Sequence, residues 1–536
     1  MQKHYNRHPR FVKPEKVRLG FNETTHRFNT AQYVPIRKTL QSIVLDQEIA
    51  DMLLFRQRPN SRNSNGIYEE YQDGSRYKEN ELFSSDTILA PKIKLQVFAD
   101  GVNLNSNQRP RHNGTMFYFT LQDLVPRYNA AMANIHLISI CKSKDLKEGS
   151  GEDNGYEKIL SLVVNEVKTL ETTGFELLVP HKGKVRIFGT IVQFTADNLG
   201  LNQVFGLVQS FNCDYCCALC YATREEMQLY FEEKYFELRT PEKYEQDLRN
   251  LELSESENIR GVLRRCVLNE LIFFKIMSNW INDCMHTLFE GIIPYVMACV
   301  LHTLIFQEKI FTLEKLNDCI QTFFLKLKVN KKHKPSIIKN INGPPKMALI
   351  PSLKAAESWC LFIYLPLILS KLVDKRNKHW QLLLMLQEIT DIVMAPKITD
   401  AMLTQFDLLY FKFLNLFQFL YPNQSIRPKM HFLVHFSTIV RKNGPMRNYW
   451  AMNYERLNGA IKKPAHTMNN FKDPIKTLAF KRQSAMLHAQ LSKKTLRDAV
   501  EIGAISKIPL KNFPQAELLK FFRPSEETFK YPSRSQ

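Results

Sequence analysis

The chain has 536 residues, of which 44% are hydrophobic and 11% aromatic, so wholesale disorder is excluded and several domain-sized units are expected. Its 73 Lys and Arg residues exceed its 53 Asp and Glu residues, and the net charge of +20 favours a polyanionic partner. Four of the ten cysteines fall within residues 213–220 and the rest are scattered. This distribution does not resemble a disulfide framework and indicates a reduced, intracellular protein.

The N-terminus is polar and basic and has no apolar segment typical of a secretory signal. The two most apolar runs, 292–306 and 359–369, are shorter than the ~20 residues that a membrane-spanning helix needs. His302 and Pro366 interrupt them. We therefore expect buried core helices and no membrane partner.

Residues 1–88 form the first region that we expect, polar and basic, with a short helix over 36–55. The sequence pattern changes at residue 89, from which apolar and polar residues alternate in strand-like segments. Strands are predicted over 93–100, 116–121, 135–141 and 185–196, and a helix with one apolar face around 160–170.

Two aspartates follow the first and fourth of these strands. Asp100 ends the run Phe98-Ala99-Asp100, and Asp197 ends the run that reaches Ala196. Each aspartate alone is typical of a turn at a strand end. Three strands, a helix and a fourth strand are, however, the order of an RNase H-like core, in which the first and fourth strands are neighbours. The two carboxylates, 97 residues apart (197 − 100), can then share a pair of metal ions.

The chain after this core, residues 221–428, is expected to be an all-helical insertion that interrupts the core. Apolar periodicity predicts its helices over 224–236, 259–279, 313–328, 355–372, 379–393 and 404–420.

Two short motifs have the spacing of the halves of a zinc site. Cys217 and Cys220 form a Cys-x2-Cys turn, and His431 and His435 lie four residues apart, on one face of a helix. Each motif alone also occurs by chance. Cys213 and Cys216 are alternative ligands, so an all-cysteine or mixed site stays open, as does the absence of zinc.

Six segments occur together in a recognisable order. They are Phe98-Ala-Asp-Gly-Val-Asn, Gln193-Phe-Thr-Ala-Asp-Asn-Leu-Gly, the Cys-x2-Cys motif, Asp283-Cys-Met-His-Thr-Leu-Phe-Glu-Gly, Met430-His-Phe-Leu-Val-His and Met452-Asn-Tyr-Glu. With these segments, the chain resembles the transposases of CACTA (En/Spm-like) DNA elements, in the divergent form found in animal genomes. The resemblance covers residues 90–490, and its motifs are specific only in combination.

The resemblance implies a DDE catalytic triad of Asp100, Asp197 and Glu455, with Asp283 and His286 as auxiliary residues. It divides the chain into the N-terminal region, a core over 89–220 that includes the Cys turn, the helical insertion, a segment 429–495 that completes the core, and a tail 496–536. The zinc site then joins the core to the end of the insertion.

The activity implied is cut-and-paste DNA transposition in the nucleus, by metal-dependent cleavage and strand transfer at element ends. Two Mg2+ or Mn2+ ions are the expected cofactors, because these hard cations prefer carboxylate oxygens, together with one structural Zn2+. The basic residues around Glu455 are expected to bind DNA phosphates. They are Arg447, Arg456, Lys462 and Lys463.

The sequence departs from the family in having only about a hundred residues before Asp100, without a Cys/His DNA-binding finger. We therefore expect a truncated copy, one that depends on a separate DNA-binding partner protein, or a host-retained remnant; a homo-oligomer is a further expectation. Three function classes remain: a DDE transposase, a catalytically inactive DNA- or chromatin-binding derivative, and another RNase H-like nuclease.

Overall fold

The structure is a computed structural model. It describes residues 7–23, 26–55, 66–85, 89–104, 113–124, 126–129, 131–147, 155–326, 334–344, 348–350, 353–467, 473–493, 505–509 and 528–532. The chain forms two compact units. Unit 1 comprises residues 1–286, 394–403 and 432–497, and unit 2 comprises 287–393, 404–431 and 498–536. Of the tail expected over 496–536, only β10 (Ile505–Pro509) and β11 (Thr528–Pro532) are described, and the rest lies outside the described residues.

Unit 1 is built on a seven-stranded sheet with the strand order β1-β2-β6-β5-β4-β8-β7. Only β4 and β8 run parallel, and every other neighbouring pair is antiparallel. The strands are β1 (Glu15–Asn22), β2 (Arg27–Tyr33), β4 (Lys92–Asn103), β5 (Asn113–Leu121), β6 (His136–Lys142), β7 (Phe175–Val179) and β8 (Gly183–Thr195). The expected neighbourhood of the first and fourth core strands, β4 and β8, is confirmed.

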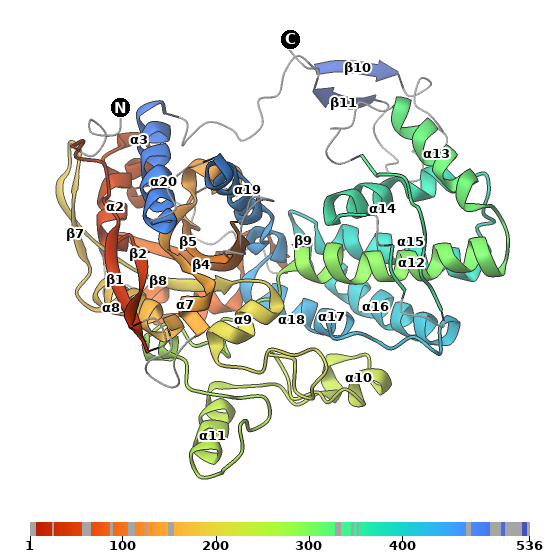
Figure 1. Ribbon diagram of the computed structural model, residues 1–536, viewed down its shortest axis with the longest axis horizontal. Coiled ribbons are helices and arrows are strands. Elements are labelled where there is room, and N and C mark those ends of the chain that lie inside the picture. The colour runs from red at the N-terminus through yellow and green to blue at the C-terminus, as the bar shows by residue number, and fades with distance from the viewer. Residues whose placement is uncertain are drawn as a thin grey trace. The chain divides into compact units, whose positions relative to one another are not determined.

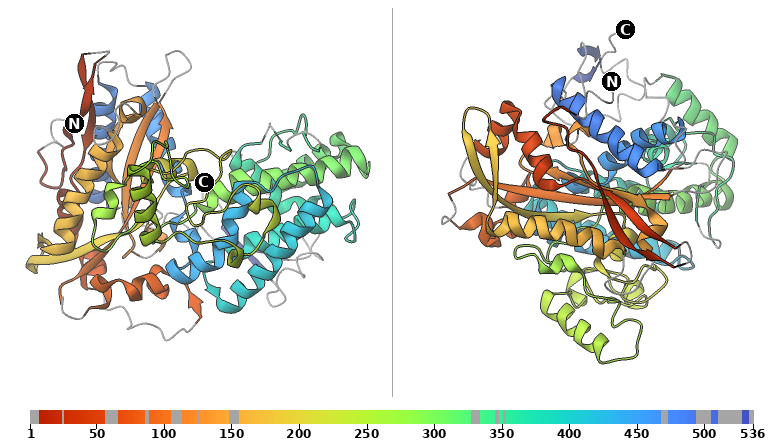
Figure 2. Two further views of the ribbon diagram at one scale, coloured as in Figure 1. Left: turned by 90° about the horizontal axis from the view of Figure 1, so that it is seen from below. Right: turned by 60° about the vertical axis from the view of Figure 1, so that its left-hand side comes forward.

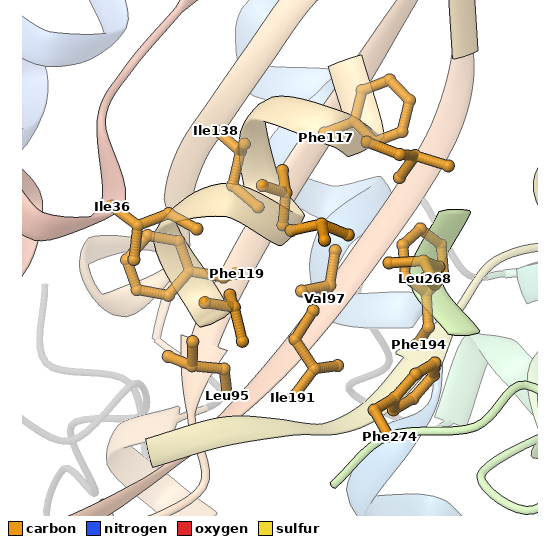
Figure 3. Packing of buried hydrophobic residues seen from close by; sticks show 14 of the residues in the cluster. Ile36, Leu95, Val97, Phe117, Phe119, Ile138, Ile191, Phe194, Leu268 and Phe274 are labelled. Carbon is orange, nitrogen blue, oxygen red and sulfur yellow. The ribbon is translucent and has the colours of Figure 1, made fainter. Parts of the chain in front are cut away.

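Strand β4 presents different chemistry on its two faces because successive side chains alternate across a sheet. Its odd-numbered residues, such as Leu95 and Val97, belong to a large apolar core together with residues of α8 (Gly155–Thr172). Figure 3 shows these two side chains beside Ile191 of β8 and Phe119 of β5. The even-numbered residues of β4, among them Asp100, point to the opposite face.

Helices cover both faces of the sheet (Figures 1 and 2). On the apolar face, α8 contacts β8 and β1, and α2 (Ile36–Val44) contacts α8 and β7. On the opposite face, α19 (Met452–Thr467) contacts β4, and α20 (Pro474–Leu491) contacts β6 and β2. The last part of unit 1 in sequence therefore packs on the central strands of the sheet.

Shorter elements complete unit 1. The helical segment expected over 36–55 is present as α2, α3 and a π-helical turn, Asp51–Phe55. The two-residue strands β3 (Ile67–Tyr68) and β9 (Ile398–Thr399) pair with each other. The remaining helices are α3 (Gln47–Ala50), α4 (Ser75–Glu79), α5 (Glu81–Ser84), α6 (Pro126–Asn129), α7 (Ser143–Lys147), α9 (Asn198–Phe205), α10 (Glu226–Leu229), α11 (Pro241–Glu252) and α18 (Phe436–Asn443). Helix α17 (Pro428–Phe432) begins in unit 2 and ends in unit 1.

The structure differs from the sequence expectations at the sheet edges. Residues 15–33, assigned above to a separate N-terminal region, form the hairpin β1–β2, which extends the core sheet through pairing of β2 with β6. Strand β7 was also missed, because its five residues lie directly after α8. The Asn/Ser/Gly-rich stretch 56–76 is expected from sequence to be a loop. Residues 56–65 lie outside the described residues, and 66–76 contain β3, a 3-10 turn at Tyr71–Asp73 and the start of α4.

The segment 259–279, expected to be a helix, contains only a 3-10 turn at Val267–Glu270. Its apolar residues, such as Leu268 and Phe274, enter the core one at a time instead of from one helical face. Asparagine side chains hold its turns, since Asn269 accepts from Ile276 N–H at 2.9 Å and Asn279 from Lys275 N–H at 3.2 Å. Residues 224–236 likewise contain only α10 and one 3-10 turn.

Unit 2 is helical. Its helices are α12 (Ile293–His302), α13 (Leu313–Lys326), α14 (Ala355–Leu369), α15 (Lys378–Val393) and α16 (Asp400–Leu420), of which α16 begins in unit 1. The last four lie where apolar periodicity predicts helices. Helix α12 packs against α14 and α15.

Helix α12 is extended by π-helical turns, Met285–Ile292 and Thr303–Gln307, into one helical segment. Among the described residues, Met285–Gln307 is the one helix long and apolar enough to cross a membrane by length and composition, with a mean hydropathy of 1.8. This helix is longer than the apolar run 292–306 identified from sequence, because it also includes residues 285–291. In the structure 78% of its apolar window is buried, which favours a core helix.

A buried ion pair fixes the start of β4 to the turn after β5. The Lys94 ammonium lies 2.6 Å from Asp123 Oδ1, and both side chains are about 95% buried, while Lys94 N–H donates to Asp123 Oδ2 at 2.6 Å. We expect Asp123→Ala to lower the free energy of unfolding by about 3–5 kcal/mol, since it leaves a buried cation uncompensated. Chemical denaturation measures this change.

The control for this prediction is Glu15→Ala, which removes the partner of Lys38 from an ion pair of the same length, 2.6 Å, with exposed side chains. We expect a change within about 1 kcal/mol, because water screens exposed pairs. Equal effects of the two substitutions would contradict a stabilising role of the buried pair.

Candidate functional site

Four residues from two distant segments form a candidate metal centre. Cys217, Cys220, His431 and His435 are all buried, and one ligand atom of each lies within 4.8 Å of the others. Thiolate sulfur and imidazole nitrogen are the ligands of structural zinc, which binds them at about 2.0–2.3 Å in a tetrahedron. The group can therefore hold a metal ion such as zinc, and it is the set that the sequence spacing favours.

A buried arginine shapes the Cys-x2-Cys turn. Arg239 donates from Nε to the carbonyl oxygens of Cys217 at 3.0 Å and Cys220 at 3.2 Å. The N–H of Leu219 points at Cys217 Sγ from 3.4 Å. These contacts direct both sulfurs to one side of the turn before any metal binds.

The two histidines lie in a continuous helical stretch, with His431 in α17 and His435 at the end of a 3-10 turn, Leu433–His435. His435 Nδ1 lies 2.7 Å from the carboxylate of Glu233, which also accepts from the Thr438 hydroxyl. The His435 side chain also interacts electrostatically with Cys217. A carboxylate that orients a ligating histidine in this way is a regular feature of zinc sites.

Glu233 was missed in the sequence because it is 202 residues from His435 and belongs to no motif. The alternative ligands Cys213 and Cys216 lie outside the four-residue group. Cys213 is half-buried and its thiol instead donates to the Ser210 carbonyl at 3.0 Å.

We expect His435→Ala to abolish stoichiometric zinc binding and Glu233→Gln to weaken zinc affinity about 10- to 100-fold, the usual effect of removing a carboxylate partner. Competition with a chelator and metal analysis of the purified protein measure both. The matched control is Glu232→Gln, which alters the neighbouring carboxylate that pairs with Lys234 at 2.8 Å. Full zinc content in a His431→Ala/His435→Ala double variant would place the ligands elsewhere, among Cys213 and Cys216.

A second group of candidate residues lies where the parallel pairing of β4 and β8 ends. The last paired residues are Phe98 and Thr195, and Asp100 and Asp197 each lie two residues further on. Asp100 is not the end of its strand, as the sequence suggested, because pairing with β5 continues to Asn103. Both aspartates line a cleft of about 490 Å³.

Asp197 also begins a helix. It is the N-cap of α9, and its Oδ1 accepts the N–H of Gly200. This explains the abrupt change from β8 to helix, since an aspartate at this position satisfies a backbone donor that the first turn leaves free.

Helix α19 brings Glu455 to the same region. His286 Nε2 lies 3.1 Å from Glu455 Oε1, and His286 Nδ1 lies 2.6 Å from Asp283 Oδ2. Asp283 is fully buried and its Oδ1 accepts from Ala451 N–H at 2.7 Å, just before α19. Burial alone would lower the pKa of His286, but its hydrogen bonds to Asp283 and Glu455 outweigh this and raise it to about 11. The imidazolium therefore neutralises two carboxylates.

Asn458, one turn after Glu455, contacts the first aspartate. Its Nδ2 donates to Asp100 Oδ2 at 2.6 Å, and its Oδ1 accepts from the Tyr118 hydroxyl at 2.8 Å. Sequence reasoning missed Asn458, although its position three residues after Glu455 on a helix places it on the same face. The side chain is buried.

The charges of these carboxylates influence one another. Burial, followed by repulsion from Glu455 and then from Asp197, raises the pKa of Asp100 to about 7. Asp100 therefore interacts electrostatically with both Glu455 and Asp197, and the convergence of the three acids stays a prediction. Their oxygens are not as close as the zinc ligands are, however: in the described part of the chain only the Cys/His group has three or more ligand atoms within 4.8 Å of one another.

The basic residues expected to bind DNA have different environments. Arg456 and Lys463 on α19 are exposed, and Lys462 is half-buried. Lys462 lies seven residues after Glu455 and shares its helical face. Arg447 is half-buried and donates from Nη1 to the Met394 carbonyl at 2.9 Å, so part of its guanidinium is structural.

The two raised pKa values predict how stability depends on pH in the metal-free protein. The pKa of Asp100 rises from 3.8 to about 7 on folding, so its proton is held more tightly in the folded state and stability falls as pH rises from 4 to 7. The contribution of His286 is complete below pH 6.5 and is lost as pH approaches 11. Both groups therefore make the protein less stable toward alkaline pH.

We expect Asp100→Asn to gain stability relative to the native protein by up to roughly 1.4 kcal/mol per pH unit between pH 4 and 7, and to keep that difference above pH 7. Chemical denaturation at a series of pH values with EDTA measures it. Asp51→Asn, which removes an exposed carboxyl group, is the control. A stability difference independent of pH would show that Asp100 is ionised throughout.

Comparison of the chain with protein-family models and with curated proteins finds no match. Its function is therefore inferred from these two sites.

Proposed function

We propose that the protein is a metal-dependent DNA-cleaving enzyme of the DDE type, with an RNase H-like core and the activity of a CACTA-like transposase. The observation that carries the proposal is geometric: Asp100 and Asp197 line one cleft where the β4–β8 pairing ends, and Asn458, one turn after Glu455 on α19, donates to Asp100 at 2.6 Å. The order of the four central strands, with the first and fourth parallel and adjacent, supports it.

Asp100, Asp197 and Glu455 would hold two Mg2+ or Mn2+ ions, which activate water or a 3′-hydroxyl group and stabilise the leaving oxygen. Hard carboxylate oxygens suit these cations. The coupling of the three acids also fits, because carboxylates that repel one another gain from a shared cation.

The remaining side chains have supporting roles in this proposal. Asn458 fixes one oxygen of Asp100 and leaves the other directed at the cleft. The positive His286 holds Glu455 near the aspartates until a metal or phosphate competes for it. Exposed Arg456 and Lys463 neutralise DNA phosphates, and a DNA substrate places the protein in the nucleus.

A second candidate function is DNA binding without cleavage, as in a host-retained derivative. The observation that favours it is the spacing of the carboxylates, which are not gathered at ligand distance, while Glu455 is bonded to His286. In this case the fold and the Cys/His metal centre would be retained for binding alone.

Nicking of supercoiled plasmid DNA distinguishes these functions. We expect cleavage with MgCl2 or MnCl2, none with EDTA, and a loss on the order of 100-fold or more in Asp100→Asn and in Glu455→Gln, since each removes a metal-binding charge. Glu48→Gln, an exposed substitution in α3, is the control and should cleave normally.

DNA binding without metal-dependent nicking would support the second candidate, and neither binding nor nicking would contradict both. Preferential cleavage of an RNA–DNA hybrid over duplex DNA would identify a different RNase H-like nuclease.

A further inference from the structure

A second pocket lies on the same face of the sheet as Asp100. It has a volume of about 330 Å³ and is lined by residues from β4, β5, α6 and α19 and from the segment 447–450. Its lining is unusually rich in side-chain amides, and one tryptophan and one arginine complete it. We call it the amide pocket, and its amides are Gln96, Gln122, Asn129, Asn448 and Asn453.

Two of these amides have hydrogen-bonding capacity that the protein does not use. Asn129 Oδ1 is buried and has no partner among the described residues. The Asn453 side chain, half-buried on α19, makes no hydrogen bond within the described part of the chain. Buried polar atoms are normally paired, so such groups at a pocket indicate a ligand with complementary donors and acceptors.

The other amides form the wall. Gln122 donates to Gln96 Oε1, and Gln96 Nε2 lies 3.4 Å from the carbonyl of Tyr449, so Gln96 is held in place. Asn448 donates to the Glu69 carbonyl at 2.9 Å. The pocket is thus built before a ligand arrives.

The lining excludes two classes of ligand. An apolar molecule would leave the amides unsatisfied. A free phosphate would find one cation, Arg447, of which Nη1 is already committed to Met394. A planar ring with donors and acceptors at its edge fits better, because the lining combines an aromatic residue, Trp450, with amide side chains of the kind that pair with the edges of bases.

We propose that the amide pocket binds a nucleobase. The base belongs either to a DNA strand held in the cleft that Asp100 and Asp197 line, the carboxylate cleft, or to a free nucleotide. The alternative in which the base is part of a DNA strand rests on the proposed function, whereas binding of a base as such does not.

The position of the pocket favours the strand. Gln96 and Asp100 lie on one face of β4, about 13 Å apart at 3.3 Å per residue. Between them Phe98 stacks on Tyr454, with ring centroids 4.2 Å apart and planes 6° from parallel. Tyr454 lines the pocket and Glu455 follows it in sequence. The distance along β4 between Asp100 and the pocket is thus about the length of four stacked nucleotides.

Two binding measurements test the proposal. Calorimetric titration with dAMP, dGMP, dCMP and TMP, and with glucose as a planarity control, tests base binding in the native protein, Trp450→Phe, Trp450→Ala and Asn453→Ala. Fluorescence anisotropy then compares a 20-nucleotide single strand with an abasic strand of equal length. Asn415→Ala, which removes an exposed amide on α16, is the matched control, and circular dichroism verifies folding of each variant.

We expect at least one nucleotide to bind, Trp450→Phe to retain binding, and Trp450→Ala to weaken it roughly 5- to 100-fold, as loss of one stacked base does. If Trp450→Ala weakens binding of the base-containing strand by the same factor but leaves binding of the abasic strand unchanged, the bound base belongs to the DNA strand. Loss for nucleotides alone identifies a free nucleotide.

Absence of nucleotide binding together with unchanged strand affinity in Trp450→Ala would overturn the proposal, as would binding of glucose in place of nucleotides. The plasmid nicking assay reports separately on the carboxylate cleft. If the native protein binds nucleotides but does not nick DNA, the base-binding proposal stands and the cleavage proposal fails. If it nicks DNA but binds no nucleotide, the cleavage proposal stands and the base-binding proposal fails.

Discussion

The packing of α19 on β4 is the contact that brings Glu455 into the region of Asp100. Glu455 follows Asp197 by 258 residues (455 − 197), so no local geometry can place it. Its position comes from the stacking of Tyr454 on Phe98, from the hydrogen bond between Asn458 and Asp100, and from the contact of the Tyr454 hydroxyl with Thr120 at 3.0 Å. Each is made on the polar face of β4 and β5.

A metal ion in the Cys/His centre would stabilise the same packing through a different part of the chain. It joins the turn that follows α9 to the helical stretch that precedes Glu455 by 20 residues (455 − 435). A metal ion bound there adds its binding free energy to folding, because the unfolded chain has no preformed site. With a metal ion bound, aromatic packing and metal ligation would together limit how far α19 can move from the aspartates.

Strands β4, β5, β6 and β8 could be predicted from sequence because alternating apolar residues specify a half-buried strand with little help from the rest of the fold. The Cys/His set was predictable because metal ligands have a fixed spacing. Glu233, Asn458 and the amide pocket could not be found in this way. They consist of common residue types whose partners are far away in sequence, as Glu233 is from His435, and only the folded chain brings them together. The segment 259–279 was wrongly predicted to be a helix, because buried residues of an irregular segment can have the same sequence spacing as one face of a helix.

The double role of Asp197 constrains how this protein can change over evolutionary time. Its carboxylate lines the cleft and also caps the first turn of α9. Drift to alanine would remove the charge and weaken the helix by about 1 kcal/mol, whereas asparagine, serine or threonine can still cap. Related chains that lose the charge at position 197 but keep the start of α9 are therefore expected to carry asparagine, serine or threonine there more often than alanine.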